Sequence, residues 1–167
     1  KEDQQKFVSY MLQDVHRLTE NITNILDLGS IESKNFKGKF VERDAVEFVS
    51  LFYQQNAHLF QDGVVTVIPP KKGCYKIALN PSLFEMLLIN LATNAFKYNE
   101  SKAPTLSVQF ERNAQGITLQ FTDNGIGIER SQSQKIFKKF YQVGDSNLMS
   151  AKGSGLGLYL VQSIITA

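Results

Sequence analysis

The chain has 167 residues, 43% of them apolar and 20% charged, a composition that is typical of a globular protein with a sizeable core. The formal net charge is +2 with scattered basic residues, which gives no electrostatic argument for a nucleic-acid partner. The single cysteine, Cys74, excludes an internal disulfide, and no apolar run approaches the roughly 20 residues needed to cross a bilayer. We therefore expect no nucleic-acid binding, no membrane contact by this segment, and a cytoplasmic location that also suits the cytosolic part of a longer membrane protein.

The first thirty residues are predicted to form one long helix. Six apolar side chains recur at steps of four, four, three, four and three, a spacing close to a heptad seam: Phe7, Met11, Val15, Leu18, Ile22 and Ile25. Gly29 lies near the expected end of this helix. The seam needs a partner helix, which either lies within this chain or belongs to a bundle with another chain or an upstream helix.

A polar stretch, "SKNFKGKFVERD", follows the first helix and is the best candidate for a domain boundary, with room for a short strand. A second helix is expected from about Ala45 to Phe60, with Ala45, Val49, Phe52 and either Leu59 or Phe60 facing inward. The segments "GVVTVIPP" and "CYKIALN" then predict two strands on either side of a Pro-Pro-Lys-Lys-Gly turn.

The second half of the chain alternates between helical and strand patterns. A helix is predicted over 81–98, two alternating strands over 105–112 and 116–123, a short helix near 134–140, and a last helix from about residue 155. This order predicts an α+β fold. We expect a two-layer α/β sandwich, with a mixed sheet that has helices on one face, preceded by a long N-terminal helix.

Two asparagines and a lysine share one face of the helix predicted over 81–98. Asn90, Asn94 and Lys97 fall within about 60° of one another on a helical wheel, and the neighbouring face is expected to be core: Phe84, Leu87, Leu91 and Ala95. Asparagine is a poor residue inside a helix. A neutral amide oxygen can complete a Mg²⁺ shell that phosphates dominate, and a lysine can contact phosphate. The alternative is a solvated helix face.

The segment "ITLQFTDNGIGI" runs from a strand into Asp-Asn-Gly-x-Gly. Asn-Gly is typical of a hairpin turn, but the residues that follow, "IERSQSQKIFKKF", do not alternate as a second strand would. The alternative is that Asp123 accepts a hydrogen bond from an exocyclic amino group, which selects adenine over guanine. Gly125 and Gly127 would then let the backbone approach a flat ligand closely.

The segment "KGSGLGLYL" opens the last helix with three glycines at every second position. Backbone N–H groups at the start of a helix form an anion site when side chains are absent. The segment is not a Walker loop, and no strand precedes it as a dinucleotide fingerprint requires. A helix start with close packing and no ligand remains the alternative.

Taken together and in this order, the three motifs carry a family resemblance. The sequence resembles the catalytic, ATP-binding domain of bacterial sensor histidine kinases, in the superfamily that includes gyrase, the Hsp90 chaperones and MutL. "NLATNAFKY" is similar to the N box, "DNGIGI" and "KGSGLGL" to the two glycine boxes, and "KIFKKFY" to the phenylalanine box. "DVHRLTENITNILDLGSIES" resembles the second helix of the dimerisation and phosphoacceptor domain. The implied domains are 1–33 for that helix, 34–44 for the linker and 45–167 for the ATP-binding domain, without the further C-terminal strands of the family.

The resemblance also implies a role for each motif residue. Asn94 would ligate Mg²⁺ beside Asn90, Lys97 would contact phosphate, and Asp123 would accept from the adenine amino group. Residues 142–152 would form an ATP lid. The implied ATP-binding residues are Asn90, Asn94, Lys97, Tyr98, Asp123, Gly125, Gly127, Ile128, Phe140, Tyr141, Lys152, Gly153, Ser154, Gly155, Leu156, Gly157 and Leu158.

One position separates a kinase from an ATPase in this superfamily. Gyrase-like members carry a glutamate that activates water where this chain has Asn90, and an amide cannot accept a proton. The resemblance therefore implies a phosphoryl donor, with ATP, a response regulator and a second copy of the chain, bound through the N-terminal helix, as partners. Neither His16 nor His58 has the family's acceptor motif, so the acceptor histidine is expected upstream. The alternative is a degenerate ATP-binding domain that regulates by interaction, without kinase activity.

Overall fold

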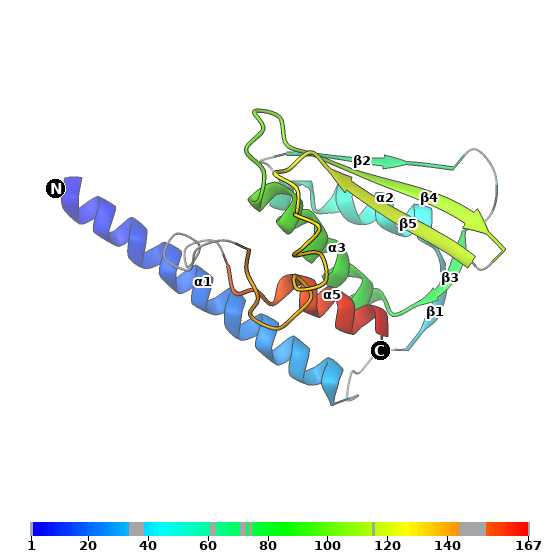
Figure 1. Ribbon diagram of the computed structural model, residues 1–167, viewed down its shortest axis with the longest axis horizontal. Coiled ribbons are helices and arrows are strands. Elements are labelled where there is room, and N and C mark those ends of the chain that lie inside the picture. Colours follow the sequence, from blue (N-terminus) through cyan, green and yellow to red (C-terminus); the bar gives the residue numbers. More distant parts are fainter. Residues whose placement is uncertain are drawn as a thin grey trace. The chain divides into compact units, whose positions relative to one another are not determined.

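The computed structural model in Figure 1 describes residues 2–33, 39–60, 63–70, 73, 75–114, 116–143 and 153–166. The chain divides into two units, and each is described by itself. One consists of Lys1–Phe36 with Gln134–Ala167, and the other of Lys37–Ser133.

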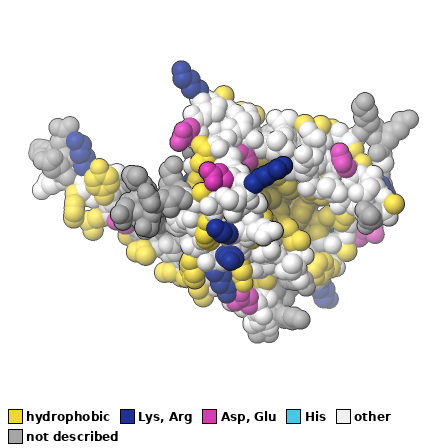
Figure 2. Space-filling model, viewed as in Figure 1, with side chains coloured by type: hydrophobic (Ala, Val, Ile, Leu, Met, Phe, Trp, Pro, Cys, Tyr) yellow, Lys and Arg dark blue, Asp and Glu magenta, His cyan; other side chains and the backbone are white. Residues whose placement is uncertain are grey.

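The first unit is built on a long helix, α1 (Glu2–Glu32), which confirms the helix predicted for the first thirty residues. The predicted seam is exposed along its whole length, from Phe7 at 66% to Ile25 at 51%, and Figure 2 shows hydrophobic side chains along α1 at the left of the view. Near its C-terminal end α1 contacts helix α5 (Gly157–Thr166), and Leu28 and Ile31 are buried there. Among the described residues, the two ends of α1 therefore differ: the C-terminal end is covered by α5, and the seam before it is exposed.

The short helix predicted over 134–140 is wrong, because this stretch forms successive turns. Its backbone hydrogen bonds span three residues, from Lys138 N to Lys135 O at 2.9 Å and from Tyr141 N to Lys138 O at 3.2 Å. The N–H of Phe140 instead donates to the carbonyl of Gly155 at 3.1 Å, and Phe140 has a φ of 61°. A left-handed residue that donates outside the segment cannot continue an α-helix.

The second unit begins with a two-stranded antiparallel sheet of β1 (Val41–Asp44) and β3 (Lys76–Leu79). Asp44 caps helix α2 (Ala45–Gln55): its Oδ1 accepts from the N–H groups of Val46 at 2.9 Å and Glu47 at 3.1 Å. Its Oδ2 accepts from the N–H of Tyr75 at 3.3 Å. Hydrogen bonds from backbone N–H groups, of which that of Glu47 has the largest effect, hold the pKa of Asp44 below its ordinary value. One carboxylate thus joins β1, the start of α2 and the residue before β3.

The predicted second helix is interrupted at Asn56. Both its backbone N–H and its side-chain amide donate to the carbonyl of Phe52, at 3.0 and 2.9 Å, which ends α2. A 3₁₀ turn, η1 (Ala57–Phe60), follows. Of the two residues considered for the inward position, Phe60 is buried and Leu59 is exposed.

A three-stranded sheet forms the other part of this unit, in the order β2 (Val64–Ile68), β4 (Thr105–Asn113), β5 (Gly116–Asp123). β2 pairs with β4 in parallel and β4 pairs with β5 in antiparallel, so the sheet is mixed. The strands predicted on either side of the Pro-Pro-Lys-Lys-Gly turn are present, but β2 and β3 lie in different sheets.

Helix α3 (Pro81–Lys97) is capped by the buried Asn80, whose side chain accepts from the N–H of Leu83 at 3.3 Å. Alternate residues of β4 are buried, namely Leu106, Val108 and Phe110, and α2 and α3 lie on that side of the sheet in Figure 1. The predicted α+β fold, with helices on one face of a mixed sheet after a long N-terminal helix, is confirmed. Among the residues that the structure describes, no helix is long and apolar enough to cross a membrane.

Candidate functional site

Helix α3 presents the asparagine face that the sequence predicts. Asn90 and Asn94 are half-buried and Lys97 is exposed, while the buried residues of α3 lie on its core side: Leu83, Leu87, Leu88, Ala92 and Ala95. The amide nitrogen of Asn90 donates to the carbonyl of Met86 at 2.8 Å, so part of this side chain is bound to its own helix. The side chain of Asn94, one turn further along, has no hydrogen-bond partner within the described part of the chain.

The end of β5 brings the Asp-x-Gly-x-Gly motif to this helix. Asp123 is the last residue of the strand, and its Oδ1 accepts from the N–H of Gly125 at 2.8 Å. The N–H of Ile126 donates to the carbonyl of Tyr98 at 3.0 Å, directly after the last turn of α3. The structure therefore brings Asp123 and Gly125 together with the end of the helix that carries Asn94.

Tyr98 is half-buried at this junction, and burial raises the pKa of its phenol. Gly127 has a φ of 73°, in the left-handed region that favours glycine, and Ile128 is exposed just beyond it. The residues after Asp123 therefore form an irregular segment next to the end of α3, not the second strand of a hairpin.

Sequence reasoning missed a polar network that holds the loop between α3 and β4 to the end of β5. The side chains of Asn99 and Asn124 form a hydrogen bond of 2.8 Å, and Asn124 also binds the backbone of Thr105 and Ala103, at 2.8 and 3.0 Å. The partners lie 19 to 25 residues apart. The only sequence signal was the Asn-Gly pair, which suggests a local turn and no distant partner.

The remaining predicted residues lie in the other unit, around the start of α5. The carbonyl of Gly155 accepts from the N–H of Phe140 at 3.1 Å, and the side-chain amide of Gln142 donates to the carbonyl of Gly153 at 2.7 Å. Residues 140–142 and 153–155 are therefore held together. Lys152 and most of the predicted lid, residues 144–152, lie outside the described residues.

The glycine-rich segment leads into α5 through a short capping turn. Ser154 Oγ accepts from the N–H of Leu156 at 3.3 Å, Leu156 is buried, and Gly157 and Leu158 are the first residues of the helix. Tyr141, the last residue of the phenylalanine box, directly follows the turns and is half-buried. The predicted helix start is present two residues later than expected.

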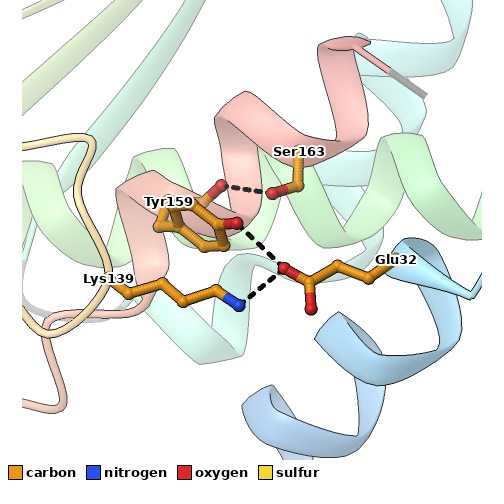
Figure 3. Close-up of polar contacts among 4 residues, drawn as sticks. All are labelled: Glu32, Lys139, Tyr159 and Ser163. Carbon is orange, nitrogen blue, oxygen red and sulfur yellow. Dashed lines mark hydrogen bonds and ion pairs between the residues drawn. The ribbon is translucent and has the colours of Figure 1, made fainter.

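A charged cluster in the same unit joins the end of α1 to α5. In Figure 3, Glu32 Oε1 forms an ion pair with the ammonium of Lys139, at 2.6 Å, and accepts a hydrogen bond from the hydroxyl of Tyr159, at 2.9 Å. The Lys139 ammonium also lies 5.0 Å from the centroid of the Tyr159 ring. Hydrogen bonds from Lys139 and Tyr159 hold the pKa of Glu32 below its ordinary value, and the Glu32 carboxylate raises the pKa of Lys139.

The described residues contain no group of three or more His, Cys, Asp or Glu side chains that could hold a metal ion. The half-buried amide of Asn94 fits a single oxygen ligand for Mg²⁺, a cation that keeps waters and phosphate oxygens in its shell and takes few ligands from the protein.

Comparison with known proteins agrees with this geometry. The family described as "Histidine kinase-, DNA gyrase B-, and HSP90-like ATPase" matches residues 80–167. The chain is 27% identical over 163 residues to the sensor protein KdpD of Clostridium acetobutylicum, covering 98% of this chain and 18% of that protein. It is 31% identical over 166 residues to the sensor protein RprX of Bacteroides fragilis, covering 91% of this chain and 30% of that protein. The chain therefore spans less than a third of either relative.

Solved structures share the fold at lower identity. The Acinetobacter baumannii histidine kinase AdeS has a TM-score of 0.70 at 21% identity, covering 95% of this chain and 72% of that chain. Full-length ShkA, solved in complex with AMPPNP, has a TM-score of 0.74 at 16% identity, covering 98% and 34%. The expected resemblance is confirmed: this chain belongs to the family of histidine kinase-, DNA gyrase B- and HSP90-like ATPases, and its relatives include sensor histidine kinases such as RcsC of Escherichia coli, at 26% identity.

Proposed function

We propose that this chain is the ATP-binding catalytic part of a two-component sensor histidine kinase. It would donate the γ-phosphoryl group of Mg-ATP to a histidine outside this chain, for relay to a response regulator. The observation that carries the proposal is the junction at Tyr98, where the end of α3 meets the end of β5 through the 3.0 Å hydrogen bond from Ile126. This contact supports the proposal because it joins the end of the helix that carries Asn94 and Lys97 to the strand end that carries Asp123.

Each residue at this junction has a separate task in the proposal. Asp123 accepts from the adenine amino group, and Tyr98 packs near the adenine or ribose. Asn94 offers an amide oxygen to Mg²⁺, which when bound neutralises charge on the phosphates, and Lys97 binds phosphate. The chain thus contributes positioning and charge neutralisation for an in-line transfer, which is most of what phosphoryl transfer needs from a protein.

The choice of a kinase over a water-activating ATPase rests on Asn90. Its amide nitrogen donates to Met86 at 2.8 Å, and no protonation state of an amide makes it a general base. A regulatory domain without kinase activity is less favoured, because Asn94, Lys97 and Asp123 are all present together with the lid glycines. Binding of the nucleotide analogue AMPPNP by ShkA, which shares the fold, supports the same assignment.

The test is calorimetric titration of the 167-residue chain with ATP and with GTP, in Mg²⁺ and in EDTA. We expect Mg²⁺-dependent binding of ATP and much weaker binding of GTP. Asn94→Ala should weaken Mg-ATP binding by about tenfold or more, since it removes an oxygen ligand that interacts with a charged group. Asp123→Asn should reduce the preference for ATP over GTP by about tenfold, since the charged acceptor is lost.

Asn113→Ala is the matched control, because Asn113 lies at the opposite end of the β4–β5 pair, where its Oδ1 accepts from the N–H of Gly116 at 3.0 Å. This variant should bind ATP as the unchanged chain does. A wild-type chain that binds no ATP in Mg²⁺ would contradict the proposed function.

A further inference from the structure

The middle residue of the Asp-Asn-Gly motif, Asn124, has hydrogen bonds in all four directions that its side-chain amide allows. Its Oδ1 accepts from the N–H of Thr105 and from the amide of Asn99, both at 2.8 Å. Its Nδ2 donates to the carbonyl of Ala103 at 3.0 Å and to Ser101 Oγ at 3.4 Å. An amide has two lone pairs and two N–H groups, so this exposed side chain has protein partners where water would ordinarily serve.

The orientation of this amide is fixed by its partners. Turned over, it would face the Thr105 N–H with its own N–H₂ group and the Ala103 carbonyl with its oxygen, which would lose both bonds. The backbone N–H of Asn124 adds a further bond to the carbonyl of Thr105 at 3.3 Å. Asn124 is therefore tied at several points to the loop that connects α3 with β4.

Asn113, at the turn between β4 and β5, is a comparison case in which an asparagine side chain forms a hydrogen bond to a residue close in sequence. Its side chain accepts from the N–H of Gly116, three residues away, and so closes the turn between β4 and β5. The partners of Asn124 are 19 to 25 residues away. The hydrogen bonds of Asn124 thus fix one segment of the fold against another and do not shape a turn.

The hydrogen bonds of Asn124 hold the loop after α3 against the Asp-Asn-Gly motif, and these two segments carry residues of the proposed nucleotide site. Asn99 donates to Asn124 and also to the carbonyl of Ala95 at 3.3 Å, in the last turn of α3. On the other side of the motif, the N–H of Ile126 donates to Tyr98 O at 3.0 Å. A side chain at Gly125 would place its Cβ only 2.6 Å from that same carbonyl oxygen. The end of α3 is therefore held against the motif on both sides of Gly125.

We infer that Asn124, acting through Asn99, is a positioning residue that sets the Asp123 carboxylate at its working distance from the end of α3. Neither asparagine needs to touch the nucleotide. Asp123 and Tyr98 each lie one residue from this pair of asparagines, so a loosened Asn99–Asn124 bond separates the base-reading carboxylate from the helix that holds the phosphates. The inference rests on the proposed function, because it explains how the adenine reader is aligned.

The distinguishing measurement is selectivity for the amino group of the base. Dissociation constants for ATP and for inosine triphosphate, which carries an oxygen in place of that amino group, are compared at a temperature where thermal unfolding shows each variant to be folded. Asn124→Ala should weaken ATP binding by about two- to tenfold, as expected for hydrogen bonds that act indirectly, and should move the ATP-to-inosine-triphosphate ratio towards one. A general destabilisation of the fold would lower the affinities for ATP and for inosine triphosphate alike and leave their ratio unchanged.

Two further variants make the test specific. Asn99→Ala should reproduce the loss of selectivity, and the double variant Asn99→Ala/Asn124→Ala should lose less than the sum of the two single changes, since both remove one shared bond. Asn113→Ala, which alters the opposite end of the same strands, should keep the wild-type ratio.

Each outcome decides between the claims. A folded Asn124→Ala chain with the wild-type ratio would overturn the positioning role, while ATP binding by the wild type would leave the proposed function standing. An equal loss of selectivity in Asn113→Ala would also overturn it. If Asn124→Ala does not fold, Asn99→Ala carries the same decision, because it breaks the bond between the asparagines and leaves the Thr105 and Ala103 bonds in place. No ATP binding by the wild type would remove both claims.

Discussion

At the scale of single residues, Gly125 is the position of the candidate site where the structure leaves no room for a side chain. An added Cβ at this position would lie 2.6 Å from Tyr98 O and 2.8 Å from Asp123 Oδ1. Both distances are shorter than real Cβ contacts allow, and one of the opposing atoms belongs to the backbone. The glycine is thus required by the close approach of α3 and β5, and not only by a turn.

Gly125→Ala should therefore destabilise the chain by about 1–3 kcal/mol, the usual range for overpacking, and should abolish detectable ATP binding. Gly29→Ala is the control, because Gly29 is inside α1 and an added Cβ would have no atom within 4 Å apart from its chain neighbours and the backbone of the helix itself. That change should stabilise α1 by up to about 1 kcal/mol through helix propensity. Thermal unfolding with titration by ATP measures both effects, and a Gly125→Ala chain of unchanged stability would contradict the crowding.

At the scale of elements, the Glu32 cluster connects α1, the turn segment before residue 140, and α5. Glu32 and Lys139 are partly exposed, with side-chain exposures of 43% and 40%, so an isolated pair would contribute little. The Tyr159 hydroxyl and ring add two more contacts to the same carboxylate and ammonium. The three side chains therefore act as a cluster that holds the end of α1 to α5.

The stabilisation from this cluster should depend on pH in a defined window. The pKa of Glu32 is lowered from 4.5, so its contribution is present above that value and is lost as the pH falls through the lower folded pKa. The pKa of Lys139 is raised from 10.5, so its contribution is lost only as the pH rises above that value. Glu32→Gln should therefore lower the unfolding temperature at pH 7, and the difference from the unchanged chain should shrink progressively as the pH falls below 4.5.

Thermal unfolding of both chains across this range is the measurement. Glu42→Gln is a matched control, because Glu42 forms an ion pair with Lys76 at 3.1 Å in which both side chains are more than half exposed. Its effect at pH 7 should be smaller than that of Glu32→Gln. An equal effect would show that the cluster adds nothing beyond a surface ion pair.

At the scale of the whole molecule, the exposed seam of α1 predicts self-association. Its six apolar side chains range from 51% to 66% exposed: Phe7, Met11, Val15, Leu18, Ile22 and Ile25. A heptad-like stripe of this length in water favours a partner helix. We expect a concentration-dependent dimer of the chain in sedimentation experiments.

Ile22→Glu should shift that equilibrium to the monomer, because it places a charge in the centre of the stripe. Leu59→Glu is the control, because Leu59 is 53% exposed in η1, outside α1. It should leave the sedimentation profile unchanged. A purely monomeric wild type at every concentration would show that the stripe needs a helix other than its own copy.

The sequence by itself determined the local elements and the family motifs of this protein. Heptad-like spacing located α1, alternation located β4 and β5, and the proline after Asn80 marked the start of α3, because these signals act over a few residues. The predicted helix over 134–140 was wrong because Phe140 binds Gly155, far along the chain. The roles of the motif residues stay predictions that the titrations above test.

Only the tertiary structure decided how these elements meet. It separated β2 and β3 into different sheets, joined Asn99 to Asn124, and gathered Glu32, Lys139 and Tyr159 on one carboxylate. These contacts join residues 25 or more positions apart, so they depend on the packing of whole elements and leave no periodic pattern in the sequence.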